Sequence, residues 1–315
     1  MSTSRFDRFE EGKKTLEKNS MFRTFERWSS PHTHPGGSVM RLIIQKMRVL
    51  INFLIRRLAS GPGREGALST LKSLERSTVG KEVLVIASGP SASRVNARAV
   101  AKAQREGNLV VIATNYFLSS PLATTITPDF LVWSDSVFHP SKAASNVSWA
   151  ELESHPSLKV MVPWTWRHKI PALLRERFLF FDDDTLETWS SNISPVRPRG
   201  YQGTTGVKAV SLGIHLGAQR INVIGLDLSY FKNFSVDEHN RVLRNPTHLT
   251  GTDSGTQNLS HNTVTGLADA LYSTANQFYY LRTLFAGYPI VNLDPDSLVD
   301  AFDKLSGHPF IKKGR

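Results

Sequence analysis

Small polar or amide-bearing residues directly follow three short apolar runs of the chain. These runs, each long enough for one buried strand, span residues 83–87, 109–113 and 130–133. Gly89, Pro90 and Ser91 follow the first run, Asn115 follows the second, and Asp135 follows the third. In an open parallel sheet, ligands bind beyond the carboxyl ends of the strands. The three segments therefore predict one shared polar ligand site at an edge of a sheet.

The residue types at these strand ends suit a nucleotide or a sugar. A glycine at position 89 lets the backbone approach a phosphate closely, and the hydroxyl of Ser91 can cap the next helix. Asn115 offers both a donor and an acceptor to a base edge or a ribose. The turn matches neither the G-x-G-x-x-G pattern of dinucleotide-binding proteins nor the phosphate-loop pattern. A plain strand-to-helix turn, with Ser91 as a cap, is the alternative interpretation.

A second polar segment precedes a helix that the apolar pattern predicts at 205–216. Thr204 and Thr205 stand at its start, and Gly217 stands at its end as a typical helix-stop residue. The free N–H groups at the N-terminus of a helix favour an anion. The pair of threonines predicts either an anion site or an ordinary helix cap.

A third polar segment follows the apolar run at 221–225. Gly225 ends the run, and the carboxylate of Asp227 could bond a ribose hydroxyl or a cytosine amine. The phenol of Tyr230 could donate to a phosphate, or the ring could pack in the core. This segment adds a fourth strand end to the predicted site.

His261 lies where a polar stretch, 231–262, meets a helix predicted at 263–285. A polar loop of that length is typical of an active-site lid. A histidine near neutral pKa can take the proton of an attacking hydroxyl, so His261 is a candidate base. His239 and His248 share the loop and compete for that role. Their spacing is not that of metal ligands, so no metal site is predicted.

The order of these segments predicts an α/β fold with a mostly parallel, Rossmann-like sheet flanked by helices. Further strands are expected at 160–163 and 290–293, and a helix at 93–106. Residues 80–315 are expected to form the catalytic domain, with the lid at 231–262. Residues 1–79 are expected to form a helical N-terminal extension.

Within that extension, residues 38–59 have the periodicity of one amphipathic helix. Basic and amide side chains fall on a single stripe, and the apolar face around it is wide. Such a helix can lie on an anionic membrane, where each basic group adds about 1 kcal/mol. Docking on the catalytic domain or between subunits would use the same apolar face.

The composition narrows the function classes. The formal net charge is +11, which favours an anionic substrate, membrane or nucleic acid. The absence of cysteine excludes disulfides, thiolate metal sites and cysteine nucleophiles. Residues 1–20 do not read as a secretory signal, and no stretch of 18 apolar residues predicts a membrane span.

The segments, in this order, resemble the bacterial sialyltransferases of glycosyltransferase family 42. They also resemble the glycosyltransferase domain of the motility accessory factors that modify flagellin. The matching stretches are VLVIASGPS at 83–91, ATN at 113–115, WSDS at 133–136, residues 203–230, His261 and VNLDPDSL at 291–298. They cover 80–315 as separate islands, of which the first loop and the 203–230 block carry most of the likeness.

The resemblance implies an inverting, metal-independent transfer of an acidic sugar from a CMP donor, without a cofactor. It implies that His261 is the base and that a tyrosine, matched here by Tyr230, stabilises the departing phosphate. It also implies that the nucleotide-binding residues are Gly89, Pro90, Ser91, Asn115, Asp135, Thr204, Thr205, Gly225 and Asp227.

This sequence departs from the family pattern at three points. Ser229 stands where the family has its first phosphate tyrosine, and no tyrosine occurs between 231 and 260. Asp135 replaces an amide, and its carboxylate would repel a phosphate. These differences leave the donor open among sialic acid, Kdo and related nonulosonic acids.

The expected function is therefore transfer of a CMP-activated acidic sugar to a surface glycan or glycolipid at the inner face of the cell membrane. Two alternatives stay open. One is a pyrophosphokinase-like enzyme that needs ATP and Mg²⁺, and the other is a non-catalytic protein that binds membranes or anions. No nucleic-acid module is recognised, and self-association is left open.

Overall fold

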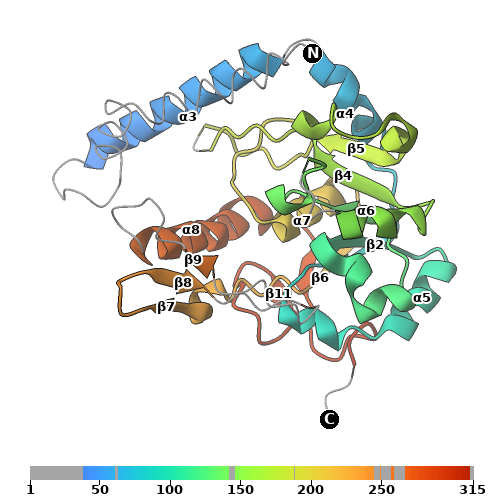
Figure 1. Cartoon of the computed structure of the whole chain (residues 1–315). Coiled ribbons are helices and arrows are strands. Elements are labelled where there is room, and N and C mark those ends of the chain that lie inside the picture. The colour runs from blue at the N-terminus through green and yellow to red at the C-terminus, as the bar shows by residue number, and fades with distance from the viewer. Residues whose placement is uncertain are drawn as a thin grey trace.

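The computed structural model describes residues 38–60, 63–141, 146–187, 189–244, 249, 257–258 and 267–312. Within this part of the chain, eight strands form one sheet in the order β11-β10-β6-β1-β2-β3-β4-β5. Every pair of neighbours in it is parallel. The predicted α/β class with a mostly parallel, Rossmann-like sheet is confirmed (Figure 1).

The predicted strands lie within one residue of their expected limits. They are β1 (Glu82–Ile86), β2 (Leu109–Thr114), β3 (Phe130–Val132), β4 (Lys159–Pro163), β6 (Arg220–Ile224) and β10 (Ile290–Asn292). Two edge strands, β5 (Phe178–Phe181) and β11 (Asp303–Lys304), were not predicted. β11 has only two residues and shows no apolar run, whereas β5 is an apolar run as long as the predicted ones and was overlooked.

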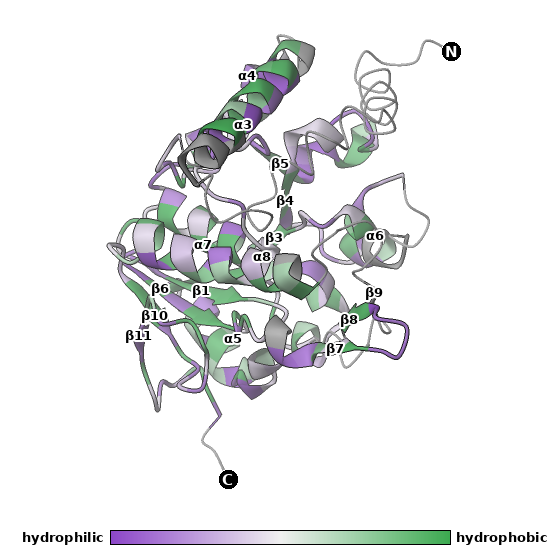
Figure 2. Ribbon diagram, turned by 90° about the vertical axis from the view of Figure 1, so that its left-hand side faces the viewer, coloured by the Kyte–Doolittle hydropathy of each residue, from purple (hydrophilic) through white to green (hydrophobic). Residues whose placement is uncertain are grey.

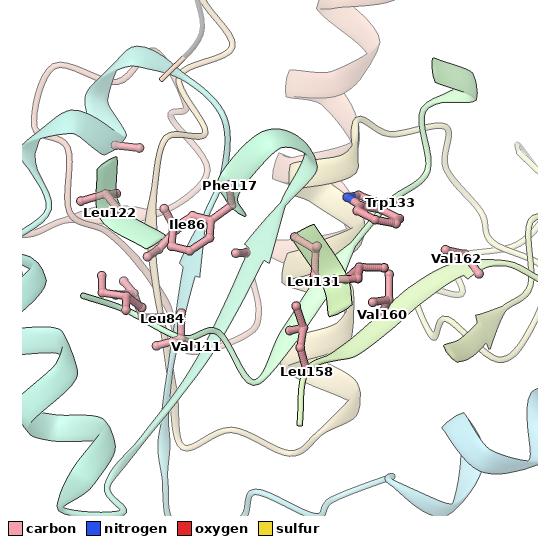
Figure 3. Close-up of a cluster of buried hydrophobic side chains, with 14 of the residues drawn as sticks. Leu84, Ile86, Val111, Phe117, Leu122, Leu131, Trp133, Leu158, Val160 and Val162 are labelled. Carbon is pink, nitrogen blue, oxygen red and sulfur yellow. The ribbon is translucent and has the colours of Figure 1, made fainter. Parts of the chain in front are cut away.

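Helices cover both faces of the sheet, and each face has its own apolar core (Figures 1 and 2). One face packs against α5 (Ala97–Arg105), and Figure 3 shows part of its core, with Leu84 and Val111 below Ile86 and with Leu131 nearer to Trp133. The other face packs against α7 (Thr205–His215) and against the end of the last long helix. The strands are apolar on both sides because both faces are covered.

One helix begins later than the sequence predicted. The chain after β1 first forms a short 3-10 turn, Pro90–Arg94, and α5 begins only at Ala97. Asn96 sets that start, because its side chain accepts a hydrogen bond from the N–H of Ala99 at 3.4 Å. α7 runs as predicted, and Gly217 ends it with a φ of 77°.

The helix predicted at 263–285 is described from Leu267 onward. It consists of α8 (Leu267–Tyr280) and one π-helical turn, Leu281–Phe285. Leu281 and Phe285 in that turn are fully buried, so they anchor the helix on the α7 face of the sheet.

The predicted lid contains a small antiparallel sheet of its own. Its strands are β7 (Phe234–Val236), β8 (Val242–Arg244) and β9 (Gln257–Asn258). Leu249, between β8 and β9, donates its N–H to the carbonyl of Ser88 at 2.9 Å. One described residue of this segment therefore touches the loop that follows β1.

The N-terminal extension contains α3 (Ser38–Ser60) and α4 (Gly63–Ser73). Leu68 and Leu71 of α4 are fully buried, one in each apolar core, so α4 closes the sheet beyond β5. In Figures 1 and 2, α3 lies outside the layer that α7 and α8 form. No helix in the described part of the chain has the length and apolar character needed to cross a bilayer.

Replacing Leu212 of α7 with alanine tests the assigned core. Leu212 is fully buried, so the change should lower the free energy of unfolding by about 2–5 kcal/mol. The matched control is Leu173→Ala, because Leu173 is 96% exposed. Its effect should stay below about 0.5 kcal/mol. Urea unfolding followed by circular dichroism measures both variants, and equal losses would contradict the packing of α7.

Candidate functional site

The strand order favours the carboxyl edge near β1 as the place where a ligand would bind. The strands β2 to β5 follow β1 on one side of it, whereas β6, β10 and β11 follow on the other. In an open parallel sheet, this reversal of strand order marks the point where loops separate and ligands bind. The loops after β1, β2, β3 and β6 all leave the same carboxyl edge, as the sequence predicted.

The loop after β1 is tied to the loop after β6. Asp227 accepts two hydrogen bonds from Ser91, one from the backbone N–H at 3.1 Å and one from the hydroxyl. The Ser91 hydroxyl oxygen in turn accepts the N–H of Gly225 at 2.9 Å. Burial raises the pKa of Asp227, and the bonds from Ser91 oppose that rise. Asp227 thus positions the Gly89-Pro90-Ser91 loop, a role that the sequence analysis did not assign to it.

Two glycines permit this close approach. A Cβ on Gly89 would overlap Asp227 Oδ2 and the carbonyl oxygen of Gly225. Gly225 has a φ of 78°, and a Cβ there would overlap the carbonyl of Ala87. The N–H of Gly89 donates to the carbonyl of Gly225 at 2.9 Å, so the two loops pair as backbone.

Asn115 stands at the carboxyl end of β2 with an unused acceptor. Its backbone is left-handed, with a φ of 52°, and its carbonyl accepts Trp133 Nε1 at 3.0 Å. Its Nδ2 donates to the hydroxyl of Ser88 at 3.1 Å. Its Oδ1 is buried and has no partner among the described residues. A buried acceptor of this kind suits a base amine or a ribose hydroxyl.

The N-terminus of α7 supplies the next groups. Thr205 shares a hydrogen bond of 2.8 Å with Ser134, which follows β3, so its hydroxyl ties α7 to the sheet. Thr204 holds the N-cap position, but its hydroxyl makes no capping bond. That oxygen is buried without a partner in the described part of the chain. Thr204 therefore presents a free hydroxyl beside the free N–H groups of the helix.

The remaining predicted residues are not all brought into the site. Asp135 is exposed and accepts the N–H of Val137 at 3.2 Å, so it caps a short helical turn. Pro90 is exposed at the outer side of the first loop. The backbone of Tyr230 begins a 3-10 turn, but its side chain lies outside the described residues. His261 and His248 also lie outside them, and His239 is exposed beside Glu238.

Sequence reasoning missed a charged cluster at the β3–β5 half of the edge. Asp182, Asp183 and Asp184 directly follow β5, and Arg199 and Lys208 lie nearby. The signal was the run of three aspartates, which gained no weight because β5 itself was not predicted. Among the described residues, no group of three or more histidines and carboxylates is arranged to hold a metal ion.

The comparisons with known proteins give a distant structural likeness and no match in sequence. No protein-family model matches the chain, and no curated protein matches its sequence. A solved structure of the MAf glycosyltransferase from Magnetospirillum magneticum AMB-1 is similar, with 14% sequence identity and a TM-score of 0.43. The match covers 78% of this chain and 38% of that chain. A likeness of this identity and TM-score says nothing about the function of this chain.

Gly89→Ala tests the close approach of the two loops. The added methyl group must displace Asp227 or the backbone of Gly225, so it should cost about 1–3 kcal/mol of unfolding free energy. Gly66→Ala is the control, because no atom lies within 4 Å of a Cβ placed there in α4. It should stabilise α4 by up to about 1 kcal/mol. Urea unfolding compares the two, and a neutral Gly89→Ala would contradict the described contact.

Proposed function

We propose that the protein is a glycosyltransferase whose donor is a CMP-activated acidic sugar. The observation that carries the proposal is the pair of buried, unpartnered acceptors, Asn115 Oδ1 and Thr204 Oγ1, at one edge of a parallel sheet. Leaving a buried polar atom unpaired costs about 1–3 kcal/mol. A ligand that forms hydrogen bonds with both oxygens would remove that cost. The strand order at β1 and the sequence resemblance stated above support the same donor class.

In this proposal the nucleotide lies at the carboxyl edge, between the loops after β1, β2 and β6. The Gly89–Ser91 loop, held by Asp227, gives a closely approachable backbone surface for the ribose. Asn115 Oδ1 accepts from the base or the ribose, and the N-terminus of α7 receives negative charge. Ser88 connects these groups, because its hydroxyl bonds both Asn115 and Thr114.

The chemistry we propose is a single displacement that inverts the anomeric centre. His261 takes the proton of the acceptor hydroxyl, and the phenol of Tyr230 stabilises the phosphate as it departs. Both assignments follow the family resemblance. The acceptor in this proposal is a growing surface glycan or glycolipid.

We further propose that α3 holds the enzyme on the anionic inner surface of the cell membrane. One face of α3 is docked on the domain: Arg56 pairs with Asp183 at 3.0 Å, and Trp189 Nε1 donates to the carbonyl of Lys46 at 2.8 Å. A different face carries six exposed apolar side chains, Ile43, Met47, Ile51, Leu54, Ile55 and Leu58. Their spacing of three and four residues makes one continuous stripe.

Charge favours a membrane over a second copy of the chain as the occupant of that stripe. α3 contains basic residues and no acidic residue. Two copies packed stripe to stripe would bring like charges together, whereas anionic lipids would neutralise them. Domain docking and membrane contact, which the sequence presented as alternatives, are compatible because they use different faces of α3.

The nucleotide preference is the first test of the proposed function. CMP and CDP should raise the melting temperature in the presence of EDTA, whereas UDP, GDP and ATP should not. Ligand at about 100 times its dissociation constant adds about 2.7 kcal/mol to the folded state. Stabilisation by ATP only when Mg²⁺ is present would instead indicate the pyrophosphokinase-like alternative.

Two variants separate CMP binding, measured by the same melting assay, from sugar transfer, measured as turnover. Asn115→Ala removes the buried acceptor and should weaken CMP binding about tenfold. His261→Ala should keep CMP affinity within a few-fold and lose transfer, because the base acts only on the acceptor hydroxyl. Unchanged turnover in His261→Ala would remove that residue from the mechanism.

Membrane contact through the stripe is tested by sedimentation with phosphatidylcholine–phosphatidylserine vesicles. Leu54→Glu places a charge in the stripe and should weaken binding roughly tenfold or more. Asn52→Glu adds the same charge at an exposed polar position and should cost about fivefold, the value of one charge near the surface. If Leu54→Glu alters only the oligomeric state, the stripe binds a second copy.

A further inference from the structure

Two basic side chains lie inside the protein at the β3–β5 half of the carboxyl edge. Lys208 comes from the second turn of α7, and Arg199 comes from the segment between β5 and α7. Both stand beside one aromatic ring: the Lys208 Nζ is 6.0 Å and the Arg199 Cζ is 5.4 Å from the centre of the Phe181 ring. Neither residue belongs to the site that the sequence predicted.

Lys208 has few partners for a charged group. Its Nζ donates to the hydroxyl of Ser134 at 2.9 Å, and Ser134 also shares a hydrogen bond with Thr205. No described carboxylate forms an ion pair with it. An ammonium has three donors, so Lys208 retains hydrogen-bonding capacity next to the N-terminal turn of α7.

Arg199 is only 5% exposed, and its guanidinium forms a single long hydrogen bond among the described residues. Its Nη2 lies 3.5 Å from the carbonyl of Asp183, a long and weak contact. Its Nε and Nη1 are buried and form no hydrogen bond of good geometry with a described residue, although the phenol of Tyr201 lies close enough to interact with the guanidinium. The rings of Phe181 and Tyr201 flank the guanidinium, each with its centre 5.4 Å from Cζ. A guanidinium held between rings with open donors is oriented for a planar anion.

The nearby carboxylates form their ion pairs with other cations, although Asp183 Oδ1 and Asp184 Oδ2 stay buried without a hydrogen-bond partner among the described residues. Asp182 pairs with the buried Arg64 of α4. Arg56 of α3 pairs with Asp183 at 3.0 Å and with Asp184 at 3.2 Å. Asp183 and the exposed Asp135 act on Lys208 only at longer range. Within the described part of the chain, the buried Arg199 and the half-buried Lys208 therefore have no ion-pair partner, an arrangement that costs free energy unless something completes it.

We propose that Lys208 and Arg199 form a binding site for an oxyanion group of the substrate, a carboxylate or a phosphate. This inference deepens the proposed function and names the group by which an acidic sugar would be distinguished from a neutral one. The site lies beside the free hydroxyl of Thr204 and away from the Gly89–Ser91 loop. The nucleotide and the acidic group would then occupy different halves of one edge.

The protonation of Lys208 supports this assignment and provides a readout. Although Lys208 retains some exposed surface, burial of its ammonium and then the charge of Arg199 lower its pKa from 10.5 to about 7. A bound anion favours the charged form, so binding at a pH above 7 should take up a proton. Between pH 7 and 10.5 the unfolded state binds this proton and the folded state does not. The free energy of unfolding therefore falls as the pH is lowered from 10.5, and the full loss is reached below pH 7.

The test uses inorganic phosphate and N-acetylneuraminate, each compared with chloride at the same ionic strength. At least one of them should raise the melting temperature of the full chain. Lys208→Met keeps the length of the side chain and should weaken that response about tenfold, the loss expected for one charged hydrogen bond. Arg199→Met should act in the same direction. Lys102→Met, at an exposed position on α5, should respond like the wild type.

The unliganded proteins separate a binding role from a structural one. At pH 6, Lys208→Met should melt at the same temperature as the wild type or higher, because it removes a buried charge. Calorimetry in buffers of different ionisation enthalpy should show proton uptake on binding to the wild type at pH 8. The inference is overturned if neither anion binds, if Lys208→Met still responds fully, or if it melts lower and the wild type takes up no proton.

CMP binding, measured separately, keeps this inference distinct from the proposed function. If CMP binds and neither anion responds to Lys208→Met, the transferase proposal stands and the oxyanion site fails. If an anion binds through Lys208 and CMP does not bind, the site stands and the CMP donor fails. A response to phosphate alone assigns the site to a phosphate, and a response to N-acetylneuraminate alone assigns it to the sugar carboxylate.

Discussion

The bond between Ser91 and Asp227 is the constraint on which the rest of the site depends. It joins the loops that follow β1 and β6, two adjacent strands separated by more than a hundred residues of sequence. A buried carboxylate is tolerated there because Ser91 supplies two donors to it. The join requires glycine at positions 89 and 225, where any side chain would overlap the facing loop. The first loop is thereby fixed before any ligand arrives, which lowers the entropic cost of binding.

The two halves of the carboxyl edge differ in how their buried polar groups are paired. Around β1 and β6 nearly every donor meets an acceptor within the protein, and only isolated oxygens such as Asn115 Oδ1 stay open. Around β3 to β5, charges predominate, and neither Arg199 nor Lys208 forms an ion pair with a described carboxylate. α7 lies between the halves and bonds to Ser134 through Thr205. One helix N-terminus can therefore serve a neutral pocket on one side and a cationic one on the other.

The N-terminal extension is part of this electrostatic arrangement. Arg56 and Arg64, from α3 and α4, neutralise the three aspartates after β5. Without them those carboxylates would be the nearest partners for Lys208 and Arg199. The extension thus keeps the two cations available, and the proposed membrane contact of α3 would connect that arrangement to the surface where a lipid-linked acceptor lies.

The sequence by itself determined the α/β class, six of the eight strands and the strand ends that carry polar residues. Those features are local: a buried strand shows as an apolar run, and the residues that follow it must lie at its carboxyl end. The tertiary structure alone decided what each polar residue bonds to. Asp227 was expected to face a ligand, and the structure adds that it holds Ser91, which the sequence could not show because the two strands are neighbours in space only. The cationic pair was hidden for the same reason, since Lys208 and Arg199 become unpaired only after Arg56 and Arg64 have taken the nearby carboxylates.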